Sequence, residues 1–101
     1  MQKHDVTYLP AAEDDLNEIV DYLLEYSINA ANDFIDGLDK LEERLSKFPE
    51  SCPLSKDKRF RRKGYRIAVL GDYLLFYVLR SEKVFIMRII HGKRDYLDLL
   101  V

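Results

Sequence analysis

The spacing of apolar residues changes once along this chain, and that change constrains the fold more than any other feature. Between residues 10 and 48 apolar residues recur every three or four positions, as in amphipathic helices. After residue 64 they form three short runs rich in β-branched and aromatic side chains, separated by Gly71-Asp72 and Ser81-Glu82. Such dipeptides suit two-residue hairpin turns. The pattern therefore predicts two helices followed by three antiparallel strands.

The expected elements are a strand over Asp5–Leu9, a helix from Pro10 to about Tyr26, a helix from Asn29 to Phe48, and strands over Tyr65–Leu70, Tyr73–Arg80 and Lys83–Ile90. Asn29 is expected to cap the second helix, and Pro49 to end it. Residues 49–58 are expected to form a loop, and Arg94–Leu100 a final helical turn. The order β-α-α-β-β-β predicts an α+β fold, a small antiparallel sheet with a helical hairpin on one face. The length of 101 residues indicates one domain over residues 1–101.

Two-residue turns also predict the strand register, with residue 67 opposite 76 and 76 opposite 87. One sheet face is then uniformly apolar and is expected to meet the helices; it holds Ile67, Val69, Leu74, Phe76, Val78, Phe85, Met87 and Ile89. The other face is mixed and is expected to be open or covered by a partner; it holds Arg66, Ala68, Tyr73, Leu75, Tyr77, Ile86 and Arg88. A bulge in either hairpin would regroup these sets.

Composition excludes several classes of protein. A hydrophobic content of 48% argues against disorder, and the apolar runs are too short to span a bilayer. The single Cys52 excludes an internal disulfide and any zinc site built from several cysteines. The chain has no metal-ligand cluster, phosphate-binding glycine loop or nucleophile elbow. We therefore expect a cytoplasmic protein without metal or cofactor.

The net charge of −2 hides an uneven distribution. Residues 1–50 carry 13 acids and 4 bases, whereas residues 51–101 carry 5 acids and 12 bases. The densest group comprises Lys56, Lys58, Arg59, Arg61, Arg62, Lys63 and Arg66. These bases either solvate a loop and an edge strand or bind an anionic partner, which would be nucleic-acid phosphate or an acidic protein segment. Phe60 and Tyr65 lie among them and would permit base stacking, and for Phe60 a place in the core is the alternative.

The last expected strand leads into residues that could move protons or hold an anion. His91 is a candidate proton shuttle, although a lone histidine after a strand is more often structural. Tyr96 is a candidate proton donor with packing as its alternative. Arg88 and Arg94 could hold an anion bidentately, or Arg88 could pair with an acid beneath the C-terminal segment. Separately, Tyr22, Tyr26 and Ile28 lie off the main helical stripe, where they either form a protein contact or wrap around the sheet edge.

Four segments, in their order and spacing, resemble the RelE/ParE superfamily of type II toxin–antitoxin toxins over nearly the whole chain. They are the start of the first helix (Pro-Ala-Ala-Glu-Asp-Asp-Leu), Gly64–Ile67, Gly71–Tyr77 and Arg88–Tyr96. The resemblance implies a toxin that an antitoxin wraps and neutralises. It also implies one of two activities: metal-independent mRNA cleavage on the ribosome in RelE-like members, or inhibition of DNA gyrase by protein contact in ParE-like members.

One position favours the ParE-like activity. The third-strand arginine of the nucleases would fall at Leu74, and leucine cannot hold a phosphate, so a nuclease would be slowed by roughly 10²–10³. The segment Ile89–Asp95 is also closer to ParE-like members. The predicted register places Leu74 on the helix-facing side, whereas a nuclease arginine must face its substrate. Either the register or the alignment is therefore off by one.

The leading hypothesis is a toxin that inhibits DNA gyrase and has a role in plasmid stabilisation. The alternatives are a ribosome-dependent mRNA endonuclease and a non-toxic binding module. In the nuclease, His91, Arg94, Tyr96 and Lys63 would be catalytic. In every case Lys58, Arg59, Arg61, Arg62, Arg66 and Arg88 are candidates for binding an anion or a partner. For the antitoxin, we expect charge reversal at Arg61, Arg62 and Arg66 to weaken the complex.

Overall fold

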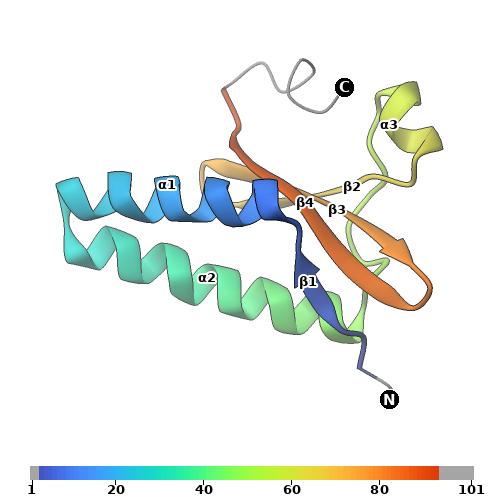
Figure 1. Ribbon diagram of the computed structural model, residues 1–101, viewed down its shortest axis with the longest axis horizontal. Coiled ribbons are helices and arrows are strands. Elements are labelled where there is room, and N and C mark those ends of the chain that lie inside the picture. The colour runs from blue at the N-terminus through green and yellow to red at the C-terminus, as the bar shows by residue number, and fades with distance from the viewer. Residues whose placement is uncertain (1–2, 94–101) are drawn as a thin grey trace.

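The computed structural model describes residues 3–93, which form a four-stranded sheet with two long helices on one side and a short helix beyond it (Figure 1). The elements are β1 (Val6–Tyr8), α1 (Pro10–Tyr26), α2 (Ile28–Lys47), α3 (Lys58–Arg62), β2 (Arg66–Leu70), β3 (Tyr73–Arg80) and β4 (Lys83–His91). The strand order is β1-β4-β3-β2; β1 runs parallel to β4, and the other neighbours are antiparallel. The predicted α+β fold is confirmed, apart from α3 and the parallel β1. The helical turn expected over Arg94–Leu100 lies outside the described residues.

The two long helices form the expected hairpin, but their junction is tighter than predicted. Ser27, not Asn29, caps α2, and its side-chain oxygen accepts a hydrogen bond from the Ala30 amide at 2.9 Å. The Ser27 amide also donates to the Leu23 carbonyl of α1. One extended residue therefore ends the first helix and caps the second, and the predicted cap Asn29 lies inside α2.

The register prediction is right for one hairpin and wrong for the other. Ile67 pairs with Phe76 as expected, but Phe76 pairs with Arg88 instead of Met87, because a bulge interrupts the β3–β4 ladder between Phe76 and Tyr77. A bulge adds one unpaired residue and reverses the inward and outward alternation beyond it. Ile89 consequently joins the helix-facing core, and Ile90 lies on the opposite face.

The assignment of the two sheet faces is the main error of the sequence analysis. The mixed face packs against α1 and α2, whereas the face expected to meet the helices packs against Phe60 and Tyr65 in a second, smaller core. The mixed face can be buried because its polar side chains form hydrogen bonds with backbone carbonyls of the chain. The Tyr77 hydroxyl donates to the Pro49 carbonyl at 2.8 Å, and Arg66 donates to the Cys52 carbonyl at 2.7 Å. We call the side that carries the second core the outer face.

Candidate functional site

The basic stretch predicted as a loop contains the short helix α3. Asp57 caps it, because its carboxylate accepts a hydrogen bond from the Arg59 amide at 2.9 Å. The same carboxylate forms an ion pair with the Arg59 guanidinium at 3.3 Å, and these contacts hold the pKa of Asp57 below its usual value. Phe60 is the buried side chain of α3 and stacks on Tyr65 with ring centroids 5.7 Å apart. This aromatic pair anchors the helix. Of the two uses predicted for Phe60, base stacking and a place in the core, the structure shows the place in the core.

Two of the candidate arginines contact the loop that precedes α3. Arg61 donates through Nε to the Ser55 carbonyl at 2.9 Å, and Arg66 donates to the Cys52 carbonyl. This loop also pairs with β2, because the amides of Ser55 and Ile67 donate to the carbonyls of Tyr65 and Pro53. Arg61 and Arg66 therefore hold the loop against the sheet edge.

The remaining bases of this stretch face solvent. Lys56, Lys58, Arg62 and Lys63 are exposed and form no ion pair within residues 3–93. Lys63 also has a structural contact, because its carbonyl accepts a hydrogen bond from Arg80 at 2.8 Å. Fewer of the seven bases are therefore available to bind an anionic partner than the sequence indicated.

His91 lies at the far end of the sheet from these bases. Its ring contacts Tyr73 edge-on at 5.3 Å, and its Nδ1 accepts a hydrogen bond from the Lys93 amide at 3.2 Å. Tyr73, which His91 contacts, begins β3, and Arg80, which contacts Lys63, ends it. These two ends of the strand lie about 23 Å apart, at roughly 3.3 Å per residue. The structure does not bring His91 and Lys63 together. Arg94 and Tyr96 lie outside the described residues.

Arg88 pairs with an acid of the chain. Its Nε and Nη2 atoms donate to the two carboxylate oxygens of Asp15 at 2.7 and 2.8 Å, and the Ile89 amide donates to the same carboxylate at 3.0 Å. The hydrogen bonds to Asp15 raise the pKa of Arg88. Asp15 was not predicted as the partner of Arg88, because nothing in the run Glu13-Asp14-Asp15 marks which carboxylate turns toward the sheet.

Leu74 lies on the outer face, beside a hollow of about 450 Å³. The hollow is lined by Pro53, Leu54, Ser55, Lys56, Asp57, Ile67, Val69 and Leu74, and we call it the outer hollow. The conflict over Leu74 is thereby explained. Its predicted pairing opposite Val69 is correct, and only the face that meets the helices was misassigned. At the place where a nuclease arginine would face its substrate, this chain presents aliphatic side chains.

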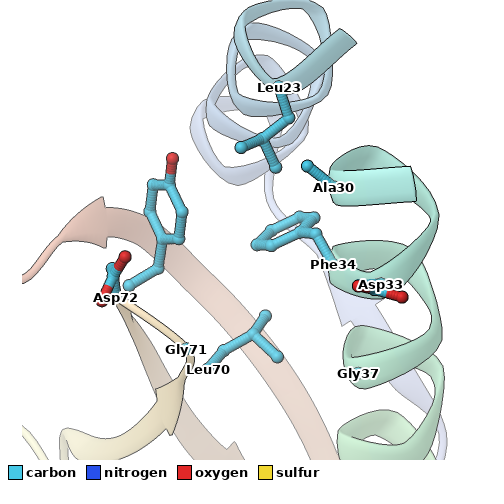
Figure 2. Close-up of a pocket in the computed structure, with 9 residues that line it drawn as sticks. Leu23, Ala30, Asp33, Phe34, Gly37, Leu70, Gly71 and Asp72 are labelled. Atoms are coloured by element: carbon cyan, nitrogen blue, oxygen red, sulfur yellow. The ribbon is translucent and has the colours of Figure 1, made fainter. Parts of the chain in front are cut away.

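A second hollow opens where the tip of the α1–α2 hairpin meets the turn between β2 and β3 (Figure 2). Its volume is about 280 Å³, and we call it the tip hollow. It is lined by Leu23, Ala30, Asp33, Phe34, Gly37, Leu70, Gly71, Asp72 and Tyr73. No sequence motif indicated it, because its lining comes from three separate segments of the chain.

Within residues 3–93, no helix is long and apolar enough to cross a membrane. The same part of the chain contains no group of histidine, cysteine and acidic side chains placed to hold a metal ion.

One comparison with known proteins identifies a family, and another shows the fold. The family model described as the ParE toxin of type II toxin-antitoxin system, parDE, matches residues 6–96. No curated protein sequence matches the chain. Among solved structures, a chain of the chromosomal ParDE TA system from P. aeruginosa superposes with a TM-score of 0.71 at 16% identity, over 90% of this chain and 98% of that one. A chain of the E. coli DinJ-YafQ toxin-antitoxin complex superposes with a TM-score of 0.60 at 18% identity, over 88% and 92%. At these identities the likeness shows the fold.

Proposed function

The chain belongs to the ParE toxin family of type II toxin–antitoxin systems, and from that premise we propose that it inhibits DNA gyrase by protein contact and is neutralised by a cognate antitoxin. The main support for gyrase inhibition by protein contact is the lining of the outer hollow. A nuclease must stabilise charge on a phosphate with cations aimed at it. Leu54, Ile67, Val69 and Leu74 offer none, and the charges of the lining are one base, Lys56, beside one acid, Asp57. Apolar side chains of this kind are suited to a protein surface.

The separation of the candidate catalytic groups supports the same proposal. General acid and base groups must reach one phosphate within hydrogen-bonding distance. His91 and Lys63 lie at opposite ends of β3, so the described residues do not assemble the proposed nuclease site.

Two parallel assays test this function. The purified toxin is added to a supercoiling reaction with purified gyrase, and to a translating extract in which mRNA ends are mapped. We expect loss of supercoiling without cuts in phase with codons. Efficient cleavage in the ribosomal A site would contradict the proposal and favour the endonuclease. If induction in cells has no effect on growth, the chain is a binding module without toxicity.

A surface variant links the result to the outer hollow. Val69 is 73% exposed on β2, so Val69→Lys changes the hollow at little cost to folding. We expect it to raise the toxin concentration for half-inhibition of gyrase by about tenfold or more, as for loss of an apolar contact in the centre of an interface. Ile35→Lys, on the exposed side of α2, is the matched control and should leave inhibition unchanged. Equal inhibition by the two variants would remove the outer hollow from the contact surface.

The exposed bases of α3 are proposed to bind the antitoxin. Arg61 and Arg66 hold the loop, so charge reversal there also disturbs the fold. Lys58→Glu/Arg62→Glu is the cleaner variant, because both side chains are exposed and form no ion pair within residues 3–93. We expect a Kd for the antitoxin about 10–100-fold higher, mainly through slower association. The control Lys40→Glu/Lys83→Glu should bind normally, and an unchanged Kd for both pairs would refute this role of α3.

A further inference from the structure

The tip hollow is small, and Leu23, Phe34 and Leu70 give it an apolar lining. Leu23 of α1 and Phe34 of α2 lie on its helical side, with Leu70 of β2 below them (Figure 2). Its volume of about 280 Å³ falls below the roughly 300–1,000 Å³ typical of small-molecule pockets. A single inserted side chain therefore suits it better than a cofactor or a drug-sized ligand.

Phe34 and Tyr73 line this hollow, and a pair of tyrosines lies at the same end of α1. Tyr73 contacts Phe34 edge-on at 5.4 Å, and Tyr22 contacts Tyr26 at 5.1 Å with their hydroxyls 2.9 Å apart. Tyr22 and Tyr26 are 50% and 71% exposed. The hydrogen bond to Tyr26 raises the pKa of Tyr22, and Tyr22 directly precedes the lining residue Leu23 in α1. Such rings bind cations over their faces, and arginine more often than lysine.

The charge on the helical side of this hollow is acidic. Asp33 and Asp72 line the hollow, and neither forms an ion pair within residues 3–93. Residues 19–37, the half of the helical hairpin next to its tip, hold four acids, Asp21, Glu25, Asp33 and Asp36, and no lysine or arginine. Lys93 is a base on the sheet side, since it follows the Gly92 that donates to the Asp72 carbonyl. A surface of this kind attracts cations and repels phosphate.

We propose that the tip hollow binds an arginine side chain of the protein that the toxin inhibits. The methylene groups of the arginine lie against Leu23, Phe34 and Leu70, and its guanidinium meets the Asp72 carboxylate, while Asp33 on the opposite side of the hollow adds to the negative potential (Figure 2). This inference rests on the proposed gyrase contact. An enzyme that grips DNA presents arginines and lysines on its DNA-facing surfaces, and the acidic hairpin complements them.

Three short peptides test the chemistry without gyrase. The ¹⁵N-labelled full chain is titrated with acetyl-Leu-Arg-Leu-amide, its citrulline analogue and its norleucine analogue. We expect the arginine peptide to shift the amide resonances of Asp33, Phe34, Gly71, Asp72 and Tyr73, with binding about tenfold tighter than that of the isosteric but uncharged citrulline peptide. Equal binding of the arginine and citrulline peptides, no shifts at 10 mM peptide, or shifts confined to the outer face would overturn the site.

Two double variants test whether the carboxylates at the hollow select arginine over citrulline. Asp33→Asn/Asp72→Asn should abolish the preference for arginine over citrulline while keeping the weak apolar binding. Asp21→Asn/Asp36→Asn removes the same charge from exposed positions that do not line the hollow and should keep the preference. Loss of the preference in both pairs would mean that overall charge, not this hollow, selects the arginine.

The last arm connects the hollow to the target. Asp33→Asn/Asp72→Asn should weaken binding to purified gyrase by about tenfold, with a smaller salt dependence than the wild-type protein, whereas the control pair should bind normally. Full binding by the first pair, together with peptide binding by the wild-type chain, would overturn the assignment to the target. Failure of the wild-type chain to bind gyrase would instead refute the proposed function, and the peptide titration would still decide the arginine site.

Discussion

The ion pair between Asp15 and Arg88 decides whether Arg88 supports the fold or binds a partner. The Asp15 carboxylate accepts two hydrogen bonds from the Arg88 guanidinium and one from the Ile89 amide, just beyond the bulge in β4. Removing one partner of a buried pair costs about 3–5 kcal/mol. Because the side chains of Asp15 and Arg88 keep 12% and 22% exposure, solvent offsets part of this cost. We therefore expect Asp15→Asn to lower the free energy of unfolding by about 2–3 kcal/mol.

Urea unfolding followed by circular dichroism at pH 7 measures this loss. With a slope of roughly 1 kcal/mol per molar urea, the midpoint should fall by about 2–3 M. Asp14→Asn changes the same charge at an exposed neighbour and should stay within about 0.5 kcal/mol of the wild-type protein. Arg88→Lys keeps the charge but loses the bidentate geometry, so its midpoint should be intermediate. If Asp15→Asn shifts the midpoint no more than Asp14→Asn, the pair does not stabilise the fold, and Arg88 returns as a candidate for anion or partner binding.

Three further predictions concern stability. Ser27→Ala should lower the free energy of unfolding by about 1 kcal/mol, whereas Asn29→Ala should change it by under about 0.5 kcal/mol; thermal unfolding compares the two. Glu82 has a φ of 66°, so Glu82→Gly should raise the urea midpoint through a gain of about 0.5–1 kcal/mol. Burial, and then its hydrogen bond to Glu42, raise the pKa of Tyr8, so the folded protein keeps a proton above pH 10 that the unfolded chain releases. Stability should therefore fall as pH rises above about 10, and Tyr8→Phe should reduce this slope by up to about 1.4 kcal/mol per pH unit in urea titrations.

Local rules were sufficient for the two long helices and for the β2–β3–β4 hairpins, because the local signals agree with one another there. Pro10 begins α1 as predicted, and both two-residue turns occur where the sequence places them. At the second turn Ser81 and Glu82 both have positive φ, the conformation that matches the twist of paired strands. Here the demands of the hairpin override the preference of these residues for negative φ, so the spacing of the strands predicted the turn better than its residue types did.

The sheet faces could not be predicted from apolar content alone. The more apolar face was assigned to the helices, but the chain carries a second cover for it, since Phe60 of α3 and Tyr65 bury Phe76 and Val78 on the outer face. The five-residue α3 is too short for hydrophobic periodicity to reveal it. Partners distant in sequence allow the other face to be buried, and single-sequence patterns do not indicate such partners.

The turn between β2 and β3 connects the two hollows. Successive side chains of a strand point to opposite faces, so Val69 and Leu74 line the outer hollow while Leu70 and Tyr73 line the tip hollow. The end of β4 holds this turn in place, because the Gly92 amide donates to the Asp72 carbonyl at 2.8 Å, and a Cβ on Gly92 would lie only 3.2 Å from that oxygen. A partner that displaces the turn from either face therefore changes both hollows together.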